Sequence, residues 1–70
     1  MKSLLLKGDS ITLAQAVKVV GLADSGGQAK HLVRGGTIKV NGTVESQPGR
    51  KLHAGDCFVG GDGIEWQVSR

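Results

Sequence analysis

The chain has 70 residues, 39% of them hydrophobic, and a formal net charge of +3. A chain of this length makes one domain at most and buries only about 60% of its unfolded surface, which leaves no room for a catalytic domain beside a binding domain. Its single cysteine excludes an internal disulfide framework and is typical of a reducing compartment. We therefore expect one domain over residues 1–70.

The N-terminal apolar run gives an expectation about location. Leu4 to Leu6 are the only consecutive leucines, and a signal-peptide core needs roughly 7–15 apolar residues. No segment approaches the ~20 apolar residues of a membrane span. We expect a cytoplasmic protein with no membrane partner.

The first elements in chain order are a short strand and a helix. The strand is predicted over residues 3–7. Thr12 and Gln15 have the spacing of a capping box, which predicts that a helix begins there, and Gly21 is a natural stop. Apolar residues recur at helical spacing between them, namely Leu13, Ala16, Val17 and Val20.

A second helix is predicted from Ser25 to Gly35–Gly36. Ser25 and Gln28 fit another capping box. The helical period places three apolar residues on one face, Ala29, Leu32 and Val33. It places small or basic residues on the opposite face, Gly27, Lys30, His31 and Arg34.

The second half of the chain predicts strands joined by turns. Thr37–Val40 alternates so that Lys39 faces outward, and Asn41-Gly42 is a strong signal for a tight hairpin. Further strands are expected at Val44, at Cys57–Val59 and at Ile64–Val68, where the alternation predicts a largely buried Trp66 on the same side as Ile64 and Val68. The order β-α-α-β-β-β-β predicts an α+β fold, with two helices packed on a small antiparallel sheet.

The sequence offers little for catalysis or metal binding. Cys57 lies in an apolar strand without a predicted base beside it, and no pair of carboxylates shares a plausible cleft. His31, His53 and Cys57 are too few and too scattered for a structural zinc site. Gly27 stands where a phosphate-binding loop needs its lysine. We expect no enzymatic activity, no cofactor and no metal.

Cations concentrate between the second helix and the residues after the hairpin. Lys30 and Arg34 lie on the helix, Lys39 follows on the strand, and Arg50-Lys51 add two more. Such a helix face is by default a solvated surface, but the surrounding glycines let a backbone approach closely. Such cations can bind the phosphates of a nucleic acid. Because the chain has only two aromatic residues, any RNA bound there would be recognised by its shape and phosphates rather than by stacking of its bases.

At these residues the chain resembles the RNA-binding domain named after small-subunit ribosomal protein S-four. The marks run from Thr12 to Phe58 and form a specific series: Ser25, Gln28-Ala29-Lys30, Arg34-Gly35-Gly36, Ile38-Lys39-Val40-Asn41-Gly42 and Gly55-Asp56. The short length and the Gly49–Leu52 segment are similar to the stand-alone bacterial members, the YbcJ type. One departure is Gly26, where the family often has an arginine.

The resemblance implies an S-four-like (alpha-L) fold whose basic helix–loop–strand corner binds structured RNA, above all ribosomal RNA. By matching position it implies RNA contacts from Gln28, Lys30, His31, Arg34, Lys39 and Asn41, to which the charge pattern adds Arg50 and Lys51. We therefore expect a ribosome-associated RNA-binding protein. Two alternatives remain open: a module that docks an acidic protein surface, and non-specific DNA binding.

Overall fold

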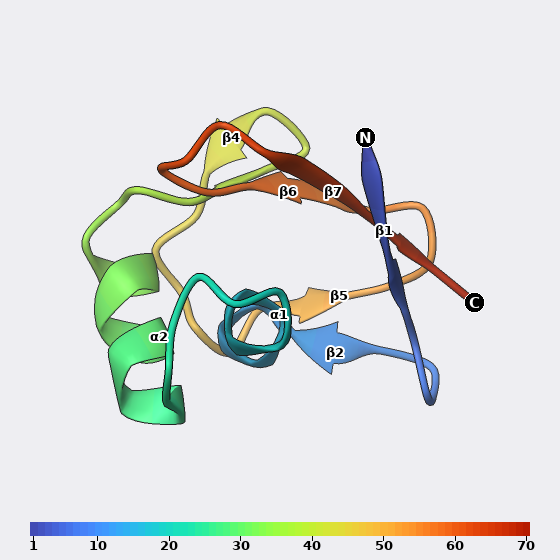
Figure 1. The fold of residues 1–70 in the computed structure, drawn as a ribbon, viewed down its shortest axis with the longest axis horizontal. Helices are drawn as coiled ribbons and strands as arrows, with labels where there is room; N and C mark the ends of the chain where they lie inside the picture. Colours follow the sequence, from blue (N-terminus) through green and yellow to red (C-terminus); the bar gives the residue numbers. More distant parts are fainter.

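The fold is a layer of two helices on a mixed β-sheet. The computed structural model describes residues 1–70, and both helices lie on the same side of the larger sheet (Figure 1). The predicted α+β class is confirmed. The elements are β1 (Lys2–Leu5), β2 (Ile11–Thr12), α1 (Leu13–Val19), α2 (Gly26–Arg34), β3 (Lys39–Val40), β4 (Thr43–Val44), β5 (Lys51–Leu52), β6 (Cys57–Val59) and β7 (Glu65–Ser69).

The larger sheet has the strand order β1-β7-β6-β3-β4, and β2 and β5 form a separate two-stranded sheet. The expectation of a wholly antiparallel sheet is wrong at one edge, where β1 pairs with β7 in parallel and Leu4 lies opposite Val68. Parallel neighbours require a long crossover between them. Here almost the whole chain is that crossover, so the pattern within either strand cannot predict the pairing.

The helix ends follow from local hydrogen bonds. Thr12 Oγ1 accepts from the Gln15 backbone N–H at 3.2 Å, and Gln15 Oε1 accepts from the Thr12 N–H at 3.1 Å, which completes the predicted capping box of α1. Gly21 follows the helix with a φ of +87°, as a helix stop of this kind requires. Neither helix has the length and apolar character that a membrane crossing requires.

The second capping box forms only in half. Ser25 Oγ accepts from the Gln28 N–H at 3.1 Å as predicted. Gln28 Oε1, however, accepts from the Asp24 N–H at 2.7 Å rather than from that of Ser25. The Gln28 side chain reaches one residue further back, and it still satisfies a backbone donor at the helix entrance.

One hydrophobic core joins the helices to the sheet. Both helices pack their predicted apolar faces against the core, although Val20 and Leu32 are only partly buried. Ile38 and Val40 of the β3 segment are buried, while Lys39 stays exposed. Phe58 on β6 is the largest fully buried side chain. The thirteen core residues are Leu4, Leu13, Ala14, Ala16, Val17, Ala23, Ala29, Val33, Ile38, Val40, Leu52, Phe58 and Val68.

Trp66 is largely buried, as its alternation predicts, although less completely than Val68, which is 1% exposed. Ile64, expected on the same side, is 39% exposed. The Trp66 ring packs at the margin of the core and also lies beside Lys2 of the neighbouring strand, with the Lys2 Nζ 5.4 Å from the ring centroid. Alternation predicts which face of the sheet a side chain occupies. Whether that position is buried depends on how far the helices extend over that face.

We therefore expect Phe58 to contribute more to stability than Trp66, although Trp66 is the larger residue. Phe58→Ala should lower the free energy of unfolding by about 3–5 kcal/mol because it leaves a cavity in the core. Trp66→Ala should cost less, about 2–3 kcal/mol, because Trp66 lies at the margin of the core and keeps part of its surface in water. Urea unfolding followed by circular dichroism measures both values. If Phe58→Ala does not fold, Phe58→Leu replaces it, and a cost for Trp66→Ala equal to that of Phe58→Ala would contradict the assigned burial.

Candidate functional site

The exposed face of α2 carries three basic side chains. Lys30 and Arg34 stand four residues apart, on successive turns, and His31 lies between them in sequence. All three are exposed, whereas Ala29 and Val33 on the opposite face are fully buried. The two ion pairs of the structure, Arg50–Glu45 and Arg70–Asp9, involve none of these three residues.

A glycine turn connects this helix to β3. Gly35 ends the helix, and Gly36 has a φ of +77°, a conformation that L side chains rarely adopt. A Cβ atom at Gly36 would lie 3.8 Å from Val44 Cγ1, so the turn packs against β4. The Thr37 hydroxyl donates to the Leu32 carbonyl at 3.1 Å and holds the turn against the helix.

Lys39 follows on β3, between β4 and β6. It lies opposite Val44 on one side and Val59 on the other, and its side chain is exposed. We refer to Lys30, His31, Arg34, Lys39 and the Gly35–Gly36 turn as the basic corner. The chain brings these groups together within ten residues, on a helix and a strand that bury their other faces in the same core.

Asn41 is held in the hairpin by two side-chain hydrogen bonds. Its φ is +51° and that of Gly42 is +87°, which confirms the predicted turn with two positive φ values. Asn41 Oδ1 accepts from the Cys57 N–H at 2.9 Å, and Asn41 Nδ2 donates to Asp56 Oδ1 at 3.2 Å. Both polar atoms of the amide are therefore used inside the protein.

Asp56 joins this hairpin to the turn before β6. Its Oδ2 accepts from the His53 N–H at 2.7 Å, while Oδ1 accepts from Asn41. The hydrogen bond from the His53 N–H is the main reason why the pKa of the Asp56 carboxyl is lowered below its ordinary value. Burial opposes this effect, and the hydrogen bond from the Asn41 amide adds a smaller lowering. The sequence marks Gly55-Asp56 as part of the family pattern, but it does not reveal that Asp56 holds Asn41.

Arg50 is neutralised by an internal partner. Its Nη1 donates to Glu45 Oε1 at 2.9 Å, and this hydrogen bond is the main reason why the pKa of Glu45 is lowered. The Arg50 carbonyl also accepts from the Leu13 N–H at 2.8 Å, at the start of α1. Sequence analysis did not find Glu45 as a partner, since a five-residue separation through a loop has no regular geometry.

The eight residues predicted to contact RNA thus fall into three groups. Lys30, His31, Arg34 and Lys39 are exposed in the basic corner. Gln28, Asn41 and Arg50 have side chains that bond within the protein. Lys51 is exposed but lies on β5, opposite Thr12, in the separate two-stranded sheet.

This arrangement is suited to binding anions. Exposed ammonium and guanidinium groups on a glycine-bounded corner can contact several phosphates without a deep cavity. Its backbone is fixed by the core and by the bonds of Thr37 and Asn41, so little order has to be gained on binding.

Comparison with known proteins identifies the family of the chain. A family model described as the S4 domain matches residues 4–69, which is nearly the whole chain. A search of curated proteins finds no match.

The role of Asp56 predicts a dependence of stability on pH. The pKa of Asp56 is lowered from 3.8, so the folded protein binds this proton less tightly than the unfolded chain does. The carboxylate therefore stabilises the fold fully above about pH 5, and this contribution disappears as the pH falls through the folded pKa. Asp56→Asn should cost about 1–3 kcal/mol at neutral pH, because asparagine cannot accept both hydrogen bonds as the carboxylate does.

Urea unfolding of the variant and the parent between neutral and acid pH measures this dependence. We expect the difference in the free energy of unfolding between the parent and Asp56→Asn to become smaller as the pH falls. Glu65→Gln is the matched control, since Glu65 is exposed on β7, and it should change stability by no more than about 0.5 kcal/mol. A difference for Asp56→Asn that stays constant down to acid pH would contradict the role of the ionised carboxylate.

Proposed function

Because the chain belongs to the S4 domain family, a family of RNA-binding modules, we propose that its basic corner binds structured RNA and that ribosomal RNA is the main target. The protein acts as a non-enzymatic binding module in the cytoplasm, with residues 1–70 as one domain. The observation that carries the proposal is the exposure of Lys30 and Arg34 on α2, unpaired by any carboxylate, immediately before the glycine turn that leads to Lys39.

Recognition rests on phosphates and on the shape of the RNA. Phe58 is 1% exposed, and Trp66 is partly buried on β7 beside Lys2, so neither aromatic residue belongs to the basic corner. Single-stranded RNA is usually bound by stacking its bases on such rings. A corner of cations and glycines is better suited to the backbone of a folded RNA, whose phosphates are spaced regularly.

In this proposal the eight residues have different roles. Lys30, Arg34 and Lys39 contact phosphates, and His31 borders the same surface. Gln28, Asn41 and Arg50 position the backbone of the corner rather than contact RNA, a role supported by their internal hydrogen bonds. Lys51 contributes only where the RNA is large enough to extend from the corner to β5.

Charge reversal in the corner should weaken RNA binding strongly without unfolding the protein. Lys30→Glu with Arg34→Glu replaces two exposed side chains, so the free energy of unfolding should change by no more than about 0.5 kcal/mol per site. Affinity for a folded ribosomal RNA fragment should fall at least about tenfold, since two phosphate contacts become repulsive. Filter binding measures the affinity, and circular dichroism checks the fold.

Lys7→Glu with Lys18→Glu is the matched control. It changes the net charge by the same amount at two exposed lysines outside the corner, and it should retain most of the RNA affinity. An equal loss in both double variants would indicate a response to net charge alone. A folded corner variant with undiminished affinity would overturn the proposal, and strong binding of an acidic protein without RNA binding would favour the docking alternative.

The salt dependence should report the number of phosphate contacts. Among the predicted RNA contacts, the unpaired Lys and Arg residues are Lys30, Arg34, Lys39 and Lys51, because Arg50 is paired with Glu45. With three or four contacts, the slope of log affinity against log salt concentration should lie between roughly −2 and −3.6. Lys39→Ala should reduce its magnitude by somewhat less than about one unit. A slope near zero would show that apolar contacts hold the RNA.

A further inference from the structure

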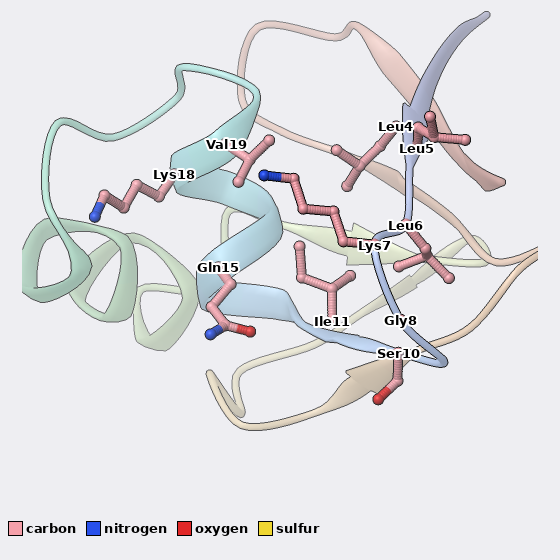
Figure 2. Close-up of a pocket in the computed structure, with 10 residues that line it drawn as sticks. All are labelled: Leu4, Leu5, Leu6, Lys7, Gly8, Ser10, Ile11, Gln15, Lys18 and Val19. Carbon is pink, nitrogen blue, oxygen red and sulfur yellow. The ribbon is translucent and has the colours of Figure 1, made fainter. Parts of the chain in front are cut away.

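A second surface lies between β1 and α1. It is a shallow groove of about 570 Å³, bordered by residues from β1, the loop to β2 and α1 (Figure 2). No residue of α2 or β3 lines it, so it is separate from the basic corner. In Figure 1, α2 and β1 lie toward opposite ends of the long axis of the molecule.

Aliphatic side chains are exposed to solvent at the groove. Val19 is 62% exposed, and Figure 2 shows it facing the space between β1 and α1 together with the partly buried Ile11. Leu5 is 69% exposed at the margin of the groove, where its side chain points away from α1. Val19 is the last residue of α1 and is followed by Val20, which packs against the core. Aliphatic residues gathered around one hollow mark an interaction site more often than the same residues scattered singly.

The charges at the groove have one sign. Lys7 and Lys18 line it, and Figure 2 shows the Lys7 side chain extending across the space between β1 and α1 toward Val19, whereas the Lys18 side chain points from α1 away from β1. No carboxylate lines it. The nearby loop residue Asp9 is paired with Arg70 at 3.3 Å and does not belong to the lining. An occupant that complements the groove therefore combines aliphatic side chains with carboxylates.

The backbone of β1 also borders this site. Residues 4–8 line the groove consecutively, and β1 is an edge strand whose one neighbour is β7. An edge strand leaves backbone N–H and C=O groups unpaired along its outer side. A peptide segment can bond to such groups, which makes a polypeptide a better fit than a lipid or a nucleic acid.

From these features we propose that the groove between β1 and α1 binds an acidic amphipathic segment of another protein. Aliphatic side chains of the segment cover Ile11 and Val19, its backbone runs along the edge of β1 beside Leu5, and its carboxylates pair with Lys7, while Lys18 adds positive charge at the margin of the groove. RNA fits less well, because the lining holds no aromatic ring and only two cations. A second copy also fits less well, since a two-fold interface would bring the lysines of each groove toward those of the other with no acid between them.

The test uses a displayed library of random peptides of about 10 residues, because an extended segment rises about 3.3 Å per residue and can then pass along the whole of β1. The full chain is the first target. The Lys30→Glu and Arg34→Glu double variant is the second target, and a peptide that binds only the first target is discarded as a binder of the basic corner. We expect the peptides selected on both targets to combine Asp or Glu with Leu, Ile or Phe. Backbone amide shifts on titration with one such peptide should concentrate in residues 4–11 and 15–19.

Two pairs of substitutions then separate charge from apolar contact. Lys7→Glu with Lys18→Glu should weaken the selected peptide at least about tenfold, and Leu5→Ser with Val19→Ser should do the same. All four side chains are exposed, so circular dichroism and RNA affinity should stay near those of the parent. Retained RNA binding in these variants shows that a loss of peptide binding is independent of the proposed RNA function.

Several outcomes would overturn the proposal. These are selection of neutral or basic peptides, selection of no peptide at all, and amide shifts confined to α2 and β3. Amide shifts in residues 4–11 that grow with protein concentration alone would identify a second copy as the occupant. Shifts in the same residues on adding RNA, lost in the Lys7→Glu and Lys18→Glu variant, would identify RNA.

Discussion

The basic corner depends on the burial of two adjacent elements in one core. Ala29 and Val33 fix which side of α2 faces inward, and Ile38 and Val40 do the same for the strand segment that follows. Once these four side chains are buried, Lys30, Arg34 and Lys39 must point to solvent, because helical and strand periods place them on the other faces. The apolar residues therefore present the cations, and a loosened core would disturb the corner before any cation were changed.

The backbone between these elements is held by a few polar side chains. Thr37 ties the glycine turn to α2, and Asn41 ties the hairpin to Asp56 and Cys57. Their hydrogen bonds use groups that would otherwise be open to a ligand. In a domain with so small a core, local bonds of this kind replace part of the rigidity that a larger protein obtains from packing.

Charge on this protein is divided between paired and free groups, and the division matters more than the net value of +3. Arg50 and Arg70 are paired with carboxylates. Lys30, Arg34 and Lys39 remain free in the basic corner, Lys7 and Lys18 remain free at the groove between β1 and α1, and Lys51 is exposed on β5. The basic corner is glycine-rich and suits phosphates, whereas the groove is aliphatic and suits an amphipathic polypeptide. A module with two such surfaces would bring a protein partner to an RNA.

Short-range signals in the sequence determined much of this structure. The capping box at Thr12, the two positive φ values at Asn41-Gly42 and the alternation of Ile38, Lys39 and Val40 depend on neighbouring residues alone, and all three predictions are confirmed. The family pattern also lies in the sequence, and a family model covers residues 4–69. The exposure of Lys30, Arg34 and Lys39 follows from the same local periods.

Only the tertiary structure decided how distant segments meet. Loop closure determines the parallel pairing of β1 with β7 and the pairing of Arg50 with Glu45. The partial exposure of Trp66 depends on how far the rest of the fold covers that end of the sheet. The groove between β1 and α1 arises from the same contacts. Local propensity contains no information about such contacts, because each brings together residues whose relative positions the loops and the core determine jointly.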